Sequence, residues 1–171
     1  AAPSASEVIA AAAPDAQGRL GDVLDLYCGT GTIALCLAPY ARSVTGIELV
    51  EEAVVNARKS ATNNGLKNTT FYAGDVGEVL AQERLPQRAK YDAVVVDPPR
   101  AGLMPGAIEE LTKLQMRRLV YVSCNPEALA RDLPKLSDAG FVVESVKAVD
   151  MFPQTAHIET VVALRREGMN D

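Results

Sequence analysis

The stretch GDVLDLYCGTGTIAL, residues 21–35, joins an apolar run to a glycine-rich turn and then to an apolar segment with a helical pattern. Gly29, Gly31 and Ala34 fit the pattern G-x-G-x-x-G/A, which connects a strand to a helix in nucleotide-binding α/β folds. The two glycines permit a tight turn and let a ligand approach the backbone closely. This pattern alone does not separate nicotinamide, flavin and S-adenosylmethionine sites.

Strand and helix patterns alternate along most of the chain. Apolar runs predict strands at residues 21–27, 43–49, 68–75, 91–99, 118–124, 141–150 and 157–166. Helical patterns occur at residues 32–40, 51–65, 106–116 and 126–136. The alternation predicts an α/β fold, in which helices cover a parallel sheet. Ligands of such sheets bind outside the carboxyl ends of the strands, so site residues are expected at the strand ends.

Composition places the chain among ordinary globular proteins. It has 171 residues, 48% of them hydrophobic and 23% charged, which fits one domain with a sizeable core. No stretch approaches a membrane span or a signal peptide, so no membrane contact is expected. Three cysteines without CxxC spacing are typical of a reducing cytosol, so we expect a cytoplasmic protein with neither disulfides nor a bound metal.

Charge bears on the choice of ligand. The net charge of −5 is not typical of a nucleic-acid-binding protein, although the later half of the chain holds 11 of the 17 basic residues and a local basic surface is possible there. Asp25 precedes the glycine turn, and no Lys or Arg follows until Arg42. An anionic pyrophosphate is poorly matched to such a turn, whereas the sulfonium and ammonium groups of S-adenosylmethionine suit it. We therefore favour the methyl donor over a dinucleotide.

Acidic residues end the second and third predicted strands. Glu48 lies where a carboxylate can bind two ribose hydroxyls, and Asp75 follows the next strand. Either residue has a simpler interpretation as a helix cap or a surface charge.

Two further strand ends carry unusual chemistry. DPPRAGL, residues 97–103, leaves its strand through two prolines, which stiffen the backbone. That loop is expected to hold Asp97 near the donor's methyl group and Arg100 toward an anionic substrate, unless it is only a rigid strand exit. YVSCNPEALARDL, residues 121–133, places Cys124 between a strand and a helix start, where a thiolate is favoured, although a buried cysteine is more often packing. His157 and Glu159 begin the last strand and share a face.

DLYCGTGTIAL, GIEL, VVVDPPRAGL, YVSCNPEALARDL and DMFPQTAHIETV resemble, in order and spacing, the motifs of the RNA uracil-C5 methyltransferases, which make 5-methyluridine in tRNA or ribosomal RNA. The resemblance extends from Gly21 to Arg166. It implies the Rossmann-like class I fold of S-adenosylmethionine-dependent methyltransferases, with a seven-stranded, mostly parallel sheet whose last strand is antiparallel. RNA is then the expected partner.

The resemblance also implies roles for single residues. Cys124 matches the nucleophile that adds to C6 of uracil, and Glu159 matches the base that resolves the adduct. Four positions match residues that contact the methyl donor: Tyr27, Thr32, Glu48 and Asp97. We add three more from their places at the turn and the strand end: Gly29, Gly31 and Asp75.

The chain departs from the family at its start. Family members usually carry an RNA-binding β-barrel domain upstream, and many add a cysteine cluster for an iron–sulfur centre. Here about twenty residues precede the glycine motif. We therefore expect a lead-in helix or tail at residues 1–20 and a catalytic domain at residues 21–171, monomeric and without an iron–sulfur cluster.

Three alternatives remain open at the level of sequence. The nearest is an S-adenosylmethionine-dependent amino-group methyltransferase, because a proline-rich strand end also suits amino substrates and needs no thiol. A nicotinamide-linked oxidoreductase uses the same glycine turn. A non-catalytic RNA-binding or protein-binding module would keep the fold alone.

Overall fold

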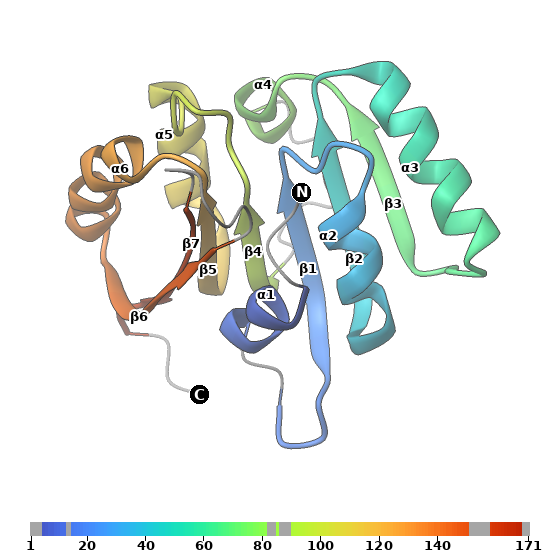
Figure 1. The fold of residues 1–171 in the computed structure, drawn as a ribbon, viewed down its shortest axis with the longest axis horizontal. Coiled ribbons are helices and arrows are strands. Elements are labelled where there is room, and N and C mark those ends of the chain that lie inside the picture. Colours follow the sequence, from blue (N-terminus) through green and yellow to red (C-terminus); the bar gives the residue numbers. More distant parts are fainter. Residues whose placement is uncertain (1–4, 13–14, 82–84, 86–89, 151–157, 169–171) are drawn as a thin grey trace.

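Strands account for the centre of the molecule. The computed structural model describes residues 5–12, 15–81, 85, 90–150 and 158–168. In these residues the strands are β1 Leu20–Leu26, β2 Ala41–Glu48, β3 Thr69–Ala73, β4 Lys90–Val96, β5 Gln115–Ser123, β6 Phe141–Val149 and β7 Glu159–Arg166. They form one seven-stranded sheet in the order β3-β2-β1-β4-β5-β7-β6 (Figure 1).

Strand directions follow the sequence prediction. β1 pairs in parallel with β2 and β4, and the parallel pairs β2·β3 and β4·β5 extend the sheet on either side. β7 lies between β5 and β6 and is antiparallel to both. The prediction of a mostly parallel, seven-stranded sheet with an antiparallel last strand is therefore confirmed.

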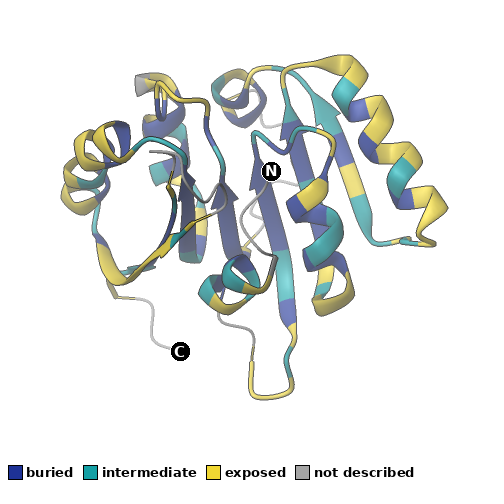
Figure 2. Cartoon of the chain, in the orientation of Figure 1, coloured by how far each residue is buried: buried dark blue, intermediate teal, exposed yellow. Residues whose placement is uncertain are grey.

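Helices cover both faces of the sheet. They are α1 Ala5–Ala12, α2 Thr32–Leu37 with the short 3-10 turn η1 Ala38–Tyr40, α3 Glu51–Asn63, α4 Val76–Ala81, α5 Pro105–Lys113 and α6 Pro126–Asp138. One buried cluster joins α1, α2 and α3 to one face, and a second joins α4, α5 and α6 to the other. Figure 2 shows that burial is greatest in the central strands, whereas the helices expose their outer sides.

Two elements differ from the sequence prediction. The helix predicted at residues 106–116 was too long, because α5 ends at Lys113 and β5 begins at Gln115. Met116 is fully buried in the sheet, where it pairs with Tyr91 of β4, so burial outweighs the helical pattern there. The six-residue helix α4 was not predicted, because it is too short to show a helical period. Among the described residues, no helix is long and apolar enough to cross a membrane.

Candidate active site

The glycine turn follows β1 directly. Tyr27 has a φ of 63°, a left-handed conformation that is strained for a residue with a side chain, and Gly29 and Gly31 have φ values of 54° and 84°. The Gly31 N–H donates to the Cys28 carbonyl at 2.8 Å, which closes the turn before α2 begins. A Cβ at Gly31 would lie 3.0 Å from the Ala57 Cβ, so the turn packs tightly against α3. Thr32, the first residue of α2, is exposed beside this turn.

Glu48 connects the turn to the end of β2. Its Oε2 accepts the Gly29 N–H at 3.0 Å, and its Oε1 accepts the Val50 N–H at 2.9 Å. Because a carboxylate oxygen accepts more than one hydrogen bond, the half-buried Glu48 can also receive ribose hydroxyls. Leu49 and Val50 beside it are 67% and 55% exposed, an apolar surface that the sequence analysis did not single out.

Asp75 caps a helix in this structure. Its Oδ1 accepts the Glu78 N–H at 3.1 Å, and its carbonyl accepts the Val79 N–H at 2.8 Å, so it fixes the start of α4. The Asp75 side chain is exposed, and its charge reaches the Tyr27 hydroxyl. Burial first, and then the Asp75 charge, raise the pKa of Tyr27 to about 12. The structure thus gives Asp75 the capping role, and it does not place Asp75 among the residues that line the cavity at the glycine turn.

Three acids and one thiol lie at the carboxyl edge of the sheet. Valines in β1, β4, β5 and β7 belong to the buried cluster beneath α1, α2 and α3, namely Val23, Val95, Val122 and Val161. Because side chains alternate along a strand, Asp25 of β1 and Glu159 of β7, each two residues from one of these valines, point to the same side. Asp97 and Cys124 directly follow the last residues of β4 and β5 at the same edge. The fold therefore brings acids and the thiol from distant parts of the chain to one edge.

Two of these acids are electrostatically strained. Asp25 has no solvent exposure, and neither of its carboxylate oxygens has a hydrogen-bond partner among the described residues. Burial first, and then the charge of Asp97, raise the pKa of Asp25 to about 8. The Ala34 N–H lowers this pKa but does not reach hydrogen-bonding geometry. Burial and then the Glu159 charge raise the pKa of Asp97 to about 6.

A cavity opens beside the acids. It has a volume of about 270 Å³ and is lined by Tyr27, Cys28, Gly29, Thr30, Thr32, Ile33 and Asp97. Its walls are the glycine turn, the first turn of α2 and the end of β4. Most of the residues predicted to contact a methyl donor therefore meet here.

Cys124 and Glu159 both belong to the carboxyl edge of the sheet. The antiparallel register of β5 and β7 ends with Ser123 opposite Thr160. Cys124 follows Ser123 in the bend that leaves β5, and Glu159 precedes Thr160 as the first residue of β7. Both side chains are half-buried. His157 lies outside the described residues.

The three cysteines are free thiols. Cys28 is buried, and burial raises its pKa well above the usual range for a thiol. The Cys28 thiol packs directly against the backbone of Gly46, because a Cβ at Gly46 would lie only 2.8 Å from the Cys28 Sγ. In the part of the chain that the structure describes, no three His, Cys, Asp or Glu residues are grouped to hold a metal ion.

Helix α6 connects the ends of β4 and β5, through residues that the sequence analysis did not single out. The Asn125 Nδ2 donates to the Arg100 carbonyl at 2.9 Å, and its Oδ1 accepts the Glu127 N–H at 3.1 Å. Asp132, which is fully buried, accepts the Leu103 N–H at 2.8 Å. One signal was present: Asp132 is an acid in the buried stripe of α6 that also holds Ala128, Leu129 and Leu136.

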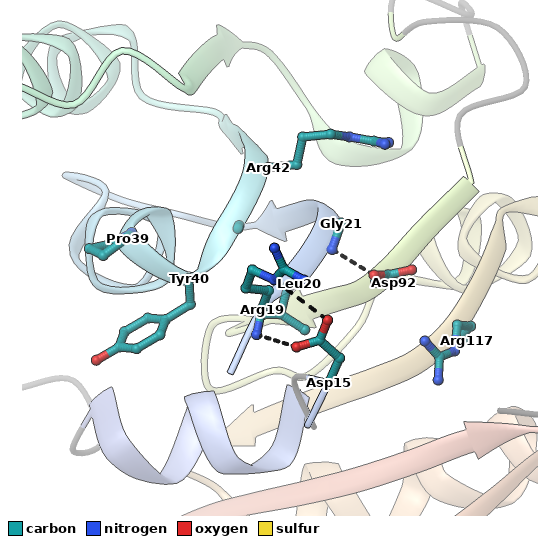
Figure 3. A pocket seen from close by; sticks show the side chains of 10 residues that line it. Asp15, Arg19, Leu20, Gly21, Pro39, Tyr40, Arg42, Asp92 and Arg117 are labelled. Atoms are coloured by element: carbon teal, nitrogen blue, oxygen red, sulfur yellow. Dashed lines mark hydrogen bonds and ion pairs between the residues drawn. The ribbon is translucent and has the colours of Figure 1, made fainter. Parts of the chain in front are cut away.

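A second cavity lies at the opposite edge of the sheet, near the starts of β1 and β2. It measures about 470 Å³ and is lined by residues that include Tyr40 and three arginines, Arg19, Arg42 and Arg117 (Figure 3). Arg19 pairs with Asp15 at 3.7 Å, and Arg42 pairs with Asp22 at 2.6 Å. Because Arg19 and Arg42 already have acidic partners, this cavity is poorly suited to bind an anion.

The strand order, the antiparallel β7 and the glycine turn after β1 define the class: this is the class I fold of S-adenosylmethionine-dependent methyltransferases. The family described as tRNA (uracil-5-)-methyltransferase matches residues 4–167, almost the whole sequence. The chain belongs to that family, so the resemblance found in the sequence is confirmed.

Relatives agree with this placement. A protein of Caldanaerobacter subterraneus named as an uncharacterized RNA methyltransferase is 51% identical over 144 residues, which cover 84% of this chain and 31% of the relative. A Clostridium tetani protein of the same description is 50% identical over 88% of this chain and 32% of its own length. The chain spans about a third of the length of these curated relatives.

One solved structure carries a more specific description. It is the Pyrococcus abyssi tRNA (uracil-54, C5)-methyltransferase in complex with S-adenosyl-L-homocysteine. This chain is 33% identical to it, with a TM-score of 0.76 over 94% of this chain and 38% of that chain.

Proposed function

We propose that this chain transfers a methyl group from S-adenosylmethionine to C5 of a uridine in RNA, through a covalent bond between Cys124 and C6 that Glu159 resolves. The observation that supports the proposal is the register of β5 and β7, whose last pair, Ser123 and Thr160, is followed by Cys124 and preceded by Glu159 at the carboxyl edge of the sheet. Family membership supports the substrate class.

The residues at the glycine turn fit the methyl donor. S-adenosylmethionine would supply an electrophilic methyl group on a cationic sulfur. Asp97 in the cavity wall would favour a cation here. A cation beside the buried Asp25, a carboxyl without a partner among the described residues, would favour the ionised form of that acid. Glu48 would bind the ribose hydroxyls, and Leu49 would cover the adenine. The Pyrococcus abyssi relative was solved with the demethylated product of this donor.

The thiol has a defined chemical task. C5 of uracil is a poor nucleophile until a thiolate adds to C6 and pushes an electron pair into an enolate over C4 and C5. Cys124 stands one residue before Asn125, the N-cap of α6, and a helix N-terminus favours a thiolate. The enolate carbon C5 then takes the methyl group, and the C6–S bond holds the ring until the last step.

Glu159 has the complementary task. After methylation C5 still carries a proton, and removing it lets the C6–S bond break, which returns the electron pair to the thiolate and restores the ring. Glu159 lies close enough to Asp97 for its charge to raise the Asp97 pKa, after the larger effect of burial. Two neighbouring carboxylates resist being ionised together, so this pair is suited to accept one proton.

RNA would approach from the same edge. Arg100 is exposed three residues after Asp97, where a cation can meet a backbone phosphate. The target base would have to leave its stack to expose C5 and C6, as other base-modifying enzymes require. We place the catalytic domain at residues 21–171 and treat the RNA as tRNA or ribosomal RNA.

The test compares two substitutions with labelled S-adenosylmethionine and RNA. Cys124→Ala should bind S-adenosylhomocysteine like the parent, methylate nothing and retain no RNA on a denaturing gel. Glu159→Gln should accumulate a methylated covalent protein–RNA complex, because the adduct forms but cannot lose its proton. Cys36→Ala is the matched control, a half-buried thiol in α2 that should behave like the parent.

Two results would contradict the proposal. Methylation by Cys124→Ala at the parent rate would make the thiol a packing residue and favour amino-group methylation, in which the substrate nitrogen attacks the methyl group and no enzyme thiol is needed. Free turnover by Glu159→Gln would assign proton removal to another group, with Asp97 tested next.

A further inference from the structure

Asn125 forms a bridge between two strand ends. Its side-chain carbonyl caps α6 by accepting the Glu127 N–H, and its side-chain N–H reaches across to the Arg100 carbonyl at 2.9 Å. Ser123 fixes the residue itself: its hydroxyl donates to the Asn125 carbonyl at 2.9 Å and accepts the Asn125 N–H at 3.1 Å. The bridge therefore starts from an immobilised residue adjacent to Cys124.

The loop on the other side of the bridge, residues 98–103, receives further support from α6. Arg131 donates to the Ala101 carbonyl, and Asp132 accepts the Leu103 N–H at 2.8 Å. A Cβ at Gly102, whose φ is 81°, would lie 2.5 Å from the Asp132 Oδ2, so the loop lies directly on the helix. Of these contacts, the Asn125 bridge is the one made by the residue next to the thiol.

The reaction makes the spacing of these ends important. C5 and C6 of uracil are bonded neighbours, and Cys124 must reach one while the methyl group, held near Asp97, reaches the other. A misplacement of about 1 Å can cost on the order of a hundredfold in rate. Asp97 immediately precedes the loop at residues 98–103 that the Asn125 bridge holds, and Cys124 immediately precedes Asn125. One side-chain amide thus connects both halves of the reaction.

We infer that Asn125 is a positioning residue that fixes the loop at residues 98–103, and with it Asp97, relative to Cys124. This inference rests on the proposed function. Asn125 makes no bond to the reacting atoms. Its effect should therefore fall mainly on the methyl-transfer step, since Glu48, the expected ribose ligand, is held by the Gly29 N–H and not by the segment that Asn125 supports.

Asn125→Ser separates the two bonds of this side chain. Serine is as good an N-cap as asparagine, but its shorter hydroxyl cannot also reach the Arg100 carbonyl. Asn125→Ala removes both bonds and measures the contribution of the cap. Asn68→Ser is the matched control: the Asn68 Nδ2 donates to the carbonyls of Ala38 and Ala41 at 2.8 and 2.9 Å, at the opposite edge of the sheet.

The measurements are kcat and KM for methyl transfer to RNA, affinity for S-adenosylhomocysteine by calorimetry, and amide hydrogen exchange across residues 100–103. Asn125→Ser should lower kcat by about 10- to 100-fold with S-adenosylhomocysteine affinity within about twofold of the parent, and exchange at Gly102 and Leu103 should quicken. Asn68→Ser should change none of these three.

Each other outcome has a definite meaning. A kcat for Asn125→Ser within about twofold of the parent, or a loss shared with Asn68→Ser, overturns the positioning role. If the parent transfers no methyl group, or if Cys124→Ala remains active, the proposed function fails instead. Hydrogen exchange then decides the bridge by itself, and unchanged exchange at Gly102 and Leu103 overturns it.

Discussion

Asp25 and Asp132 are both fully buried, yet their surroundings are opposite. The Asp132 Oδ2 accepts the Tyr121 hydroxyl at 2.9 Å as well as the Leu103 N–H, and Arg131 and Lys135 pair with its Oδ1 at 3.3 and 3.9 Å. Asp25 has no hydrogen-bond partner within the described ranges, and burial raises its pKa to about 8. One acid is satisfied by the fold, and the other is left without compensation.

The difference shows which of the two buried acids lowers the stability of the fold. Buried polar groups are nearly always hydrogen-bonded, and an unsatisfied one calls for an explanation. Asp132 joins α6 to β5 and to the loop after β4, so it acts through structure. Asp25 lies beside the end of β4 and next to the glycine turn, where a cationic ligand would compensate it. We interpret Asp132 as an acid used by the fold and Asp25 as an acid held ready for a ligand.

The largest expected effect is on Asp132. Asp132→Ala leaves the Tyr121 hydroxyl and the Leu103 N–H buried and unpaired, so the free energy of unfolding should fall by about 3 kcal/mol. Arg131 and Lys135 add little, because their side chains are about half exposed. Urea unfolding measures the change, with Asp138→Ala, an exposed acid at the end of the same helix, as control. A loss no larger than that of the control would show that the hydrogen bonds of Asp132 do not stabilise the fold.

Asp25 should respond in the opposite direction. Its folded pKa is above its unfolded value of 3.8, so between these values the folded state holds the extra proton. Stability therefore falls as pH rises toward about 8. Asp25→Asn should raise the free energy of unfolding by about 2 kcal/mol at pH 8 and flatten its decline.

Unfolding in urea at pH 6 and pH 8 tests this sign, because the pKa of Asp97, at about 6, affects mainly the lower range. The same variant should bind S-adenosylmethionine more weakly than the parent, which calorimetry measures. A destabilised variant with intact binding would reverse the interpretation of Asp25.

The smallest expected effects on stability are at two buried tyrosines, Tyr121 and Tyr91, which differ in whether the hydroxyl has a partner. Tyr121→Phe removes a hydroxyl that donates to Asp132, and should cost about 1 kcal/mol. The buried hydroxyl of Tyr91 has no partner among the described residues. Tyr91→Phe should therefore be neutral or slightly stabilising. Thermal denaturation of the two single variants side by side is sufficient, and equal losses would show that hydroxyl satisfaction is not what separates these sites.

The sequence predicted most of the fold because its signals were local. Buried strands such as β4 are continuous apolar runs, and the glycine turn has a fixed pattern. The prediction was wrong where a tertiary contact decided the outcome, as at Met116, which the sheet takes from a helical pattern. The predicted roles of Cys124 and Glu159 stay predictions, although both residues flank the last pair of the β5 and β7 register, Ser123 and Thr160.

The supporting residues were beyond sequence reasoning for a physical reason. Asn125 reads as a helix cap, and that local role is present, but its second bond goes to a residue 25 positions away. Asp132 is 29 positions from Leu103. Such distances in sequence carry no local pattern, so the buried stripe of α6 was the one hint available.

The strand order also has a consequence for synthesis. β1 pairs with β2 on one side and with β4 on the other, and Val23 meets Ala93, seventy residues further along the chain. A ribosome therefore releases β1, β2 and β3 well before the strand that covers the far edge of β1. During that interval the unpaired edge of β1, which carries Val23, Leu24 and Leu26, is open to any neighbouring nascent chain. We expect the yield of folded protein to depend on translation speed and chaperone supply across residues 74–96 more than anywhere else in the chain.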